Sequence, residues 1–361
     1  MTGLMIGRRT LLAGCGALAG LGWTGLFAGD LAWPDPDFGT VDPGAAGFDV
    51  AALTAVVDDL MAGNSQAVMV LRGGRIAAER YVEGWDRHTA RPLASATKSM
   101  VAMLTGMAID DGFIESVEQS VSAFFPQWRG TPKEAISVRH LLTMTSGLSS
   151  RGLKARGEER DQFAVNAAAE LDHPPGTAWE YNTPIYHLLF HLVERAAGEP
   201  FEAYAQRKLL GPLGMADIEW ITNEGKGENG PVRNIYAANG SASDMGRFAL
   251  FLQRGGVWAG RRLVSADFFR AATSPSQELN PAYGYLTWLN AAPGRSAGAG
   301  GEGYRFGETA PRDLVSAIGA GGQYAAAAPS LDLAVVRLGN PAAGGEGGQP
   351  FLARICAAVR S

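Results

Sequence analysis

A long, nearly uncharged segment from Ser95 to Asp110 constrains the fold of this chain most strongly. Its apolar residues occupy most faces of a helix, so the segment predicts a helix buried in the centre of the domain. The segment begins Ser95-Ala96-Thr97-Lys98. Residues three apart share a helical face, so the Ser95 hydroxyl and the Lys98 amine would meet there. The chain has only five lysines against 26 arginines, yet such a pair also arises by chance. Other segments of the chain have to decide whether Ser95 and Lys98 form a catalytic pair.

Strand patterns lie at the two ends of the chain, and helical patterns fill most of the middle. Short runs rich in Val and Ile on either side of Gly73-Gly74 predict a β-hairpin over 66–72 and 75–82. The further expected strands are 283–290, 314–326 and 333–338, and the further expected helices are 49–61, 186–197, 201–209, 242–254 and 351–360.

This order of elements predicts the α+β class. We expect an antiparallel sheet flanked by helices, built from residues 48–110 and 231–361, with a mainly helical lobe inserted over 111–230. Together these make one domain over 48–361. A cleft between two such lobes is a usual place for a small-molecule site.

The first residues of the chain have the features of an export signal. Gly7-Arg8-Arg9-Thr10-Leu11-Leu12 resembles a twin-arginine signal, and no charge follows from Thr10 to Gly29. We therefore expect residues 1–29 to direct export to the periplasm or the exterior, followed by a linker over 30–47 that is rich in Pro, Gly and Asp. The alternatives are a retained membrane anchor, or lipidation at Cys15. A membrane is an expected partner only in those two cases.

Composition and motifs argue against several other classes of function. The net charge is −5 and no run of Lys or Arg occurs, so nucleic acid is not an expected partner. Residues 298–303 fit G-x-G-x-x-G, but no strong strand precedes them and no helix follows. His187 and His191 are four apart without the Glu of H-E-x-x-H. We expect neither a cofactor nor a metal.

Four segments carry the pattern of a hydrolytic site. They are Ser95–Lys98, Val138–Leu148, Pro175–Thr183 (which contains Tyr181), and Gly319–Gln323. A serine hydroxyl is a weak nucleophile unless a base takes its proton. Lys98 could be that base if it is neutral or shares its proton, and Tyr181 could assist if a nearby ammonium favours the phenolate.

Together the four segments resemble the serine β-lactamase-like superfamily over roughly residues 45–361. The resemblance is nearest to class C β-lactamases, DD-peptidases, family VIII carboxylesterases and 6-aminohexanoate-dimer hydrolases. It implies that Ser95, Lys98 and Tyr181 are catalytic, with Tyr181 facing Ser95 across the cleft. Whether Lys98 or Tyr181 is the general base stays open. His140, which lies in the second segment, is expected to be structural.

The resemblance also suggests how the substrate would be held. The backbone N–H of Ser95, at a helix start, is one natural oxyanion donor. The second should come from the strand expected over 319–323, with Ala320 or Gly321 favoured. Asn182, Thr183 and Gly322 are the expected substrate contacts.

Two departures from the family pattern bear on the substrate. Members that recognise penicillin carry Tyr-x-Asn, whereas here Asn182 directly follows Tyr181. Their third motif supplies a Lys or His that helps hold a carboxylate, whereas the run from Gly319 to Gly322 has no cation and nothing places Arg312 in the cleft. We therefore expect an esterase or amidase acting on a small molecule. The alternatives are a DD-peptidase or weak β-lactamase, and a non-catalytic module that binds cell-wall peptides.

Overall fold

A six-stranded antiparallel sheet organises the part of the chain that the structure describes. This computed structural model describes residues 32–154, 159–295, 302–340 and 349–360. The sheet has the strand order β2-β1-β13-β12-β11-β8. The strands are β1 Ser65–Arg72, β2 Arg75–Tyr81, β3 Arg91–Pro92, β4 Glu219–Gly227, β5 Gly230–Gly240, β6 Val257–Trp258, β7 Arg261–Arg262, β8 Trp288–Leu289, β9 Gly294–Arg295, β10 Glu302–Gly303, β11 Val315–Gly319, β12 Gln323–Ala328 and β13 Leu333–Gly339.

Helices cover both faces of this sheet. The α-helices are α1 Val50–Ala62, α2 Thr97–Asp110, α3 Val138–Leu142, α4 Gln162–Ala168, α5 Thr183–Tyr186, α6 Leu188–Ala197, α7 Phe201–Ala205, α8 Gly211–Leu213, α9 Ala242–Gln253, α10 Ala266–Ala272 and α11 Gln349–Ala357. The 3-10 turns are η1 Ala94–Ala96, η2 Val121–Ala123, η3 Pro126–Trp128, η4 Pro132–Ala135 and η6 Pro329–Leu331, and η5 Gln206–Leu210 is a π-helical turn.

The two ends of the domain meet in the sheet, as the sequence predicts. The expected hairpin of β1 and β2 turns at Gly73 and Gly74, whose φ angles are +59° and +77°. On its other edge β1 pairs with β13, the last strand of the chain, so that Val68 lies opposite Arg337. The α+β class is therefore confirmed.

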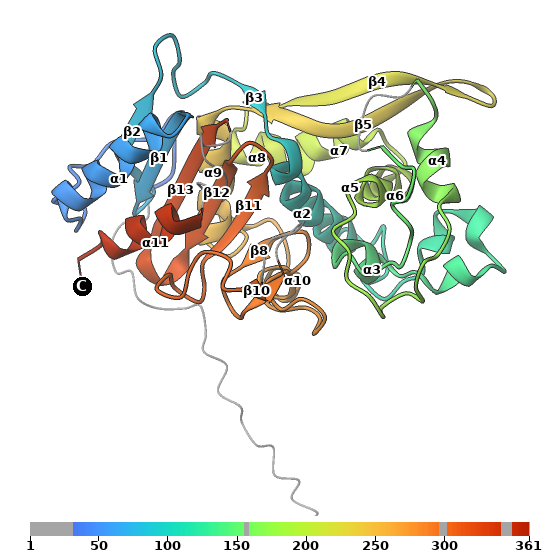
Figure 1. Cartoon of the computed structure of the whole chain (residues 1–361). Helices are drawn as coiled ribbons and strands as arrows, with labels where there is room; N and C mark the ends of the chain where they lie inside the picture. The colour runs from blue at the N-terminus through green and yellow to red at the C-terminus, as the bar shows by residue number, and fades with distance from the viewer. Residues whose placement is uncertain (1–31, 155–158, 296–301, 341–348, 361) are drawn as a thin grey trace, which may run out of the picture. The chain divides into compact units, whose positions relative to one another are not determined.

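The sheet separates two layers of helices. Helices α1 and α11 pack together on one face, and α9 covers the other (Figure 1). Tyr324 of β12 meets Phe351 of α11 edge to face, with ring centroids 5.3 Å apart. Beside the sheet lies α2, whose residues from Thr97 to Ala108 are all buried, as expected for a central helix. Helices α3 to α7 lie on the far side of α2 (Figure 1).

Three expectations about the elements were wrong. The region expected to be helical up to residue 230 ends in a long two-stranded ribbon of β4 and β5, which runs along the top of the molecule (Figure 1). The strand expected over 314–326 is two strands, because residues 320–322 form a tight turn between β11 and β12. Of the strand expected over 283–290, only Trp288–Leu289 pairs with the sheet, through β11.

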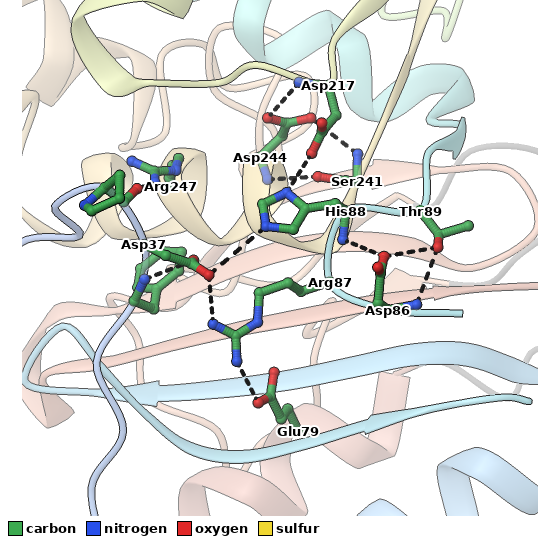
Figure 2. Close-up of polar contacts among 12 residues, drawn as sticks. Asp37, Glu79, Asp86, Arg87, His88, Thr89, Asp217, Ser241, Asp244 and Arg247 are labelled. Atoms are coloured by element: carbon green, nitrogen blue, oxygen red, sulfur yellow. Dashed lines mark hydrogen bonds and ion pairs between the residues drawn. The ribbon is translucent and has the colours of Figure 1, made fainter. Parts of the chain in front are cut away.

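The segment expected to be a linker packs against the domain over its described part, which begins at Ala32. Val41 N–H donates to the carbonyl of Ile76, and Ile76 N–H donates to the carbonyl of Gly39. Asp37 accepts from Arg87 at 2.7 Å and lies 3.8 Å from His88, whose other ring nitrogen is 2.9 Å from Asp217 (Figure 2). These contacts fix the start of the domain. The expected export signal, residues 1–29, lies outside the described residues, as do most of residues 298–303.

No helix within the described ranges has both the length and the apolar character needed to cross a bilayer.

Candidate active site

Ser95 lies in the 3-10 turn η1, and strand β5 holds this turn in place. Leu93 N–H donates to the carbonyl of Ala238 at 2.9 Å, and Ala238 N–H donates to Oγ1 of Thr97 at 3.0 Å. Between these anchors Ala94 has a φ of +48°, a left-handed conformation that costs a non-glycine residue on the order of 1 kcal/mol. The fold therefore maintains local strain directly before the expected nucleophile.

The Lys98 ammonium group is buried next to Ser95. The side chain is 1% exposed, and Nζ lies 2.8 Å from Oγ of Ser95 and 3.2 Å from Oγ1 of Thr183. Within the described residues no carboxylate forms an ion pair with it. Because burial penalises the charged form, it lowers the pKa of Lys98 to about 7. A substantial fraction of this amine is therefore neutral near pH 7 and can accept a proton.

Aromatic and imidazole side chains form the rest of the Lys98 surroundings. Nζ is 4.2 Å from the ring centroid of Tyr186 and 5.0 Å from that of Tyr181. His187 is also buried, and burial together with the Lys98 charge lowers the pKa of His187 to about 3. The imidazole is therefore neutral and adds no competing charge.

Tyr181 faces Ser95 and keeps its proton. The Ser95 side chain, which the Lys98 amine also contacts, is near enough to lower the pKa of the Tyr181 phenol. Burial nevertheless raises the pKa of Tyr181 to about 12, and Ser95 and the charge of Arg305 only partly oppose it. Tyr181 was expected to assist only if a nearby ammonium favoured the phenolate, and burial instead favours the protonated phenol.

Arg305 supplies a cation that sequence reasoning did not place near the site. Its guanidinium lies 4.4 Å from the ring centroid of Trp288, and the Trp288 ring stacks on Tyr181 at 5.8 Å and 24°. Arg312, the residue considered from sequence, lies instead over Tyr304. No local motif marks Arg305, because it reaches Tyr181 only through the packing of separate loops.

Asn182 and Thr183 have different surroundings. Asn182 is 4% exposed, its Nδ2 donates to the carbonyl of Leu148 at 2.9 Å, and its Oδ1 accepts from Ile185 N–H at 3.2 Å. The amide is therefore used inside the protein, and the expected contact of Asn182 with substrate stays a prediction. Thr183 is half-buried and contacts Lys98, so it remains a candidate.

The segment Val138–Leu148 has a structural role beside the site, as expected for His140. Ser137 caps helix α3, and Nδ1 of His140 accepts the backbone N–H of Ser137 at 3.1 Å. The following residues lead to Met144, whose carbonyl accepts from Glu180 N–H at 3.0 Å. The segment thus positions the chain immediately before Tyr181.

Strand β11 brings the fourth segment against the Ser95 turn. A Cβ at Gly319 would lie 2.0 Å from the carbonyl oxygen of Leu93 and 3.1 Å from the nitrogen of Ala96, so only glycine permits this approach. Ala320 and Gly321 follow in the turn rather than in a strand. Gly322 contacts Arg337. The expected contact of Gly322 with substrate stays a prediction.

Comparison with known proteins gives a consistent family and fold. Residues 53–353 match the family model described as Beta-lactamase. The esterase EstB of Burkholderia gladioli is 28% identical over 224 residues, which is 51% of this chain and 56% of the esterase. The 6-aminohexanoate-dimer hydrolase of Paenarthrobacter ureafaciens is 26% identical over 227 residues, which is 56% of this chain and 55% of that enzyme. The chain thus spans little more than half the length of these curated relatives.

A solved structure extends the likeness to the whole fold. A penicillin-binding protein homologue from Caulobacter crescentus superposes with a TM-score of 0.65 at 17% identity, and the match covers 88% of this chain and 97% of the homologue. Identity this low shows a shared fold and nothing about shared substrates.

Proposed function

This chain belongs to the beta-lactamase family, and we propose that it is a serine hydrolase that cleaves an ester or amide bond through an acyl-enzyme on Ser95. The observation that carries the proposal is the buried Lys98 amine, 2.8 Å from the Ser95 hydroxyl and without a carboxylate partner in the described residues. A neutral amine at that distance can accept the proton that makes a serine nucleophilic.

The pKa values favour Lys98 over Tyr181 as the acceptor of the serine proton. An amine with a pKa of about 7 is partly neutral at pH 7, whereas a phenol with a pKa of about 12 is almost never ionised. In acylation Oγ of Ser95 bonds to the carbonyl carbon and its proton passes to Lys98. Tyr181 then donates a proton to the leaving group as its bond to that carbon breaks, and recovers one from Lys98. In deacylation water attacks the acyl carbon, the same two residues carry its proton back to Oγ of Ser95, and the acid is released.

Backbone amides would stabilise the negative oxygen of the tetrahedral intermediate. We assign this role to the N–H of Ser95 and to the amides of Ala320 and Gly321. The support is the close approach of Gly319, the residue directly before Ala320, to the Ser95 turn.

Relatives and sequence departures favour simple substrates. Relatives bear the names esterase and 6-aminohexanoate-dimer hydrolase, and the Lys or His of the penicillin-recognising motif is missing here. We therefore propose a carboxylesterase or an amidase of the 6-aminohexanoate-dimer hydrolase type. A DD-peptidase or weak β-lactamase is the second candidate, since another relative is named beta-lactamase. A module that binds cell-wall peptides without turnover is the third.

Intact-mass spectrometry with a short nitrophenyl ester and with a penicillin separates these candidates. Rapid ester turnover without a penicillin adduct supports the esterase, and a stable penicillin adduct supports the DD-peptidase. No adduct with either acyl donor favours the binding module. Acylation that persists in Ser95→Ala would rule out the mechanism.

We further propose that the protein is exported through the twin-arginine signal of residues 7–12. N-terminal sequencing of protein from a native host tests this. A mature N-terminus near residue 30 is expected. An intact Met1 rules out cleavage and favours the retained membrane anchor, and a lipid-modified Cys15 favours the lipoprotein.

A further inference from the structure

The turn between β11 and β12 carries four successive carbonyl groups, and each accepts a hydrogen bond from within the protein. Gly322 N–H donates to the Gly319 oxygen at 3.1 Å, and Nε2 of Gln323 donates to the Ala320 oxygen at 3.2 Å. Nη1 of Arg337 donates to the oxygens of Gly322 and Gly321, at 2.7 Å and 3.4 Å. The orientation of every peptide group in the turn is therefore fixed.

The two side chains that hold the last three of these carbonyls are themselves buried and fixed. Gln323 is 1% exposed, and its amide both donates to the Gly339 oxygen at 2.7 Å and accepts from Gly339 N–H at 3.1 Å. Arg337 is 2% exposed, its Nε donates to Oγ of Ser65 at 2.8 Å, and its Nη2 donates to the oxygen of Asn340 at 3.1 Å.

The Arg337 guanidinium donates its hydrogen bonds mostly to backbone groups. In the described residues it forms no ion pair with a carboxylate, and burial lowers its pKa. Burying a guanidinium is costly unless hydrogen bonds offset the loss of water. Two of the carbonyl oxygens that this buried guanidinium holds belong to the turn, which implies that the conformation of the turn matters.

The orientation of the carbonyls determines that of the amides. In a trans peptide the N–H points away from the C=O. The Gly319 and Ala320 oxygens each accept a hydrogen bond, so the amides of Ala320 and Gly321, which lie opposite them in the same two peptides, are directed away from those donors, and in the described structure neither amide donates to a protein acceptor. The same turn touches the Ser95 turn through Gly319.

We propose that Gln323 and Arg337 are positioning residues that hold the carbonyls of residues 320–322, fix the conformation of the whole turn, and thereby direct the amides of Ala320 and Gly321 to the oxyanion of the Ser95 adduct. This rests on the hydrolase function proposed above. Neither side chain touches the reacting atoms. The geometry also accounts for Gly322, which has a φ of +84° and at which a Cβ would lie 1.8 Å from Nη1 of Arg337.

The test compares Arg337→Met and Gln323→Met with Arg247→Met in the full chain. Arg247 is a matched control because it is also buried, at 6% exposure, and also donates to backbone carbonyls, but to those of Leu213 and Pro36, which belong neither to the Ser95 turn nor to the β11–β12 turn. The readouts are kcat and KM for a nitrophenyl ester, the inhibition constant of an alkyl boronic acid that forms a tetrahedral adduct on the serine, and the Tm.

We expect kcat to fall about 100-fold in Arg337→Met, the boronate to bind weaker by a similar factor, and KM to change less than threefold. Arg247→Met should lose a comparable Tm while its kcat and boronate affinity stay within twofold. If Arg337→Met does not fold, Gln323→Met, which removes only the hydrogen bonds of the amide, carries the test.

Equal effects in Arg337→Met and Arg247→Met, or a change confined to KM, would overturn the positioning role. Failure of the wild-type protein to be acylated at all would instead overturn the hydrolase function. The two failures are therefore distinguishable.

Discussion

The cations of the N-terminal anchor and the Lys98 ammonium of the candidate active site have opposite electrostatic surroundings. In the N-terminal anchor, made of Asp37, Glu79, Arg87, His88 and Asp217, each cation faces a carboxylate (Figure 2). Arg87 is 2.7 Å from both Asp37 and Glu79. At the candidate active site Lys98 faces two hydroxyl groups and two aromatic rings, and no carboxylate among the described residues.

The pKa values follow this difference. Hydrogen bonding to Asp217 raises the pKa of His88, and the neighbouring carboxylates raise that of Arg87 against the effect of burial. Burial without a counter-ion lowers the pKa of Lys98 to about 7. A paired cation stabilises the fold and stays protonated, whereas a desolvated cation without a partner becomes a base.

The largest effect is expected for replacing Lys98. Lys98→Met removes the base, and Lys98→Arg leaves a group that stays protonated, so both should lower kcat/KM for a nitrophenyl ester by about 1000-fold. Lys208→Met is the control, since Lys208 is paired with Asp111 at 2.7 Å, and it should retain full activity. Activity of Lys98→Arg close to wild type would show that a charged group suffices.

Tyr181→Phe should have the next largest effect. It removes the proton donor to the leaving group but keeps the ring that stacks on Trp288, so we expect kcat to fall about 100-fold with little change in Tm. Tyr204→Phe, which loses only a 3.0 Å hydrogen bond to Asp111, serves as the control. Unchanged kcat in Tyr181→Phe would leave Lys98 to transfer both protons.

Arg305→Met should alter substrate preference about tenfold. The Arg305 charge lies beside Trp288 and Tyr181, so it should favour an ester that carries a carboxylate over a neutral one of the same size. The measurement is the ratio of kcat/KM for a nitrophenyl monoester of a dicarboxylic acid to that for a neutral nitrophenyl ester, with Arg312→Met as control. A ratio unaffected by Arg305→Met would exclude a role in selectivity.

Changes in the anchor should have the smallest effect. Because the His88 side chain is 51% exposed, solvent screens its contacts, and His88→Gln should cost less than about 1 kcal/mol and leave kcat within twofold. The folded pKa of His88 is raised above 6.5, so the stabilisation is complete below the unfolded pKa and is lost as the pH rises through the folded one. Thermal unfolding of both proteins at pH 5.5 and pH 8.5 should show a Tm difference only at the lower pH. A difference that grows with pH would contradict the pairing.

The sequence allowed the central helix, the β1–β2 hairpin and the groups Ser95, Lys98 and Tyr181 to be predicted, because each depends on local periodicity or on a short motif. The internal hydrogen bond of Asn182 could not be predicted, because its partner, the carbonyl of Leu148, is distant in the sequence. The contacts of Arg305 and Arg337 could not be predicted for the same reason, since their partners lie on other loops and strands. The β4–β5 ribbon was missed because Gly, Asn and charged residues interrupt its apolar residues, so that no clear strand pattern stands out.

The pKa of Lys98 is the quantity that tests this account most directly. Carbon-13 NMR of protein labelled at lysine Cε would resolve few signals, since the chain has five lysines, and Lys98→Arg would assign the one of interest. The account predicts a titration midpoint of about 7 for Lys98. A midpoint near 10.5, the ordinary value for lysine, would show that the amine is charged at neutral pH and would contradict its role as the base.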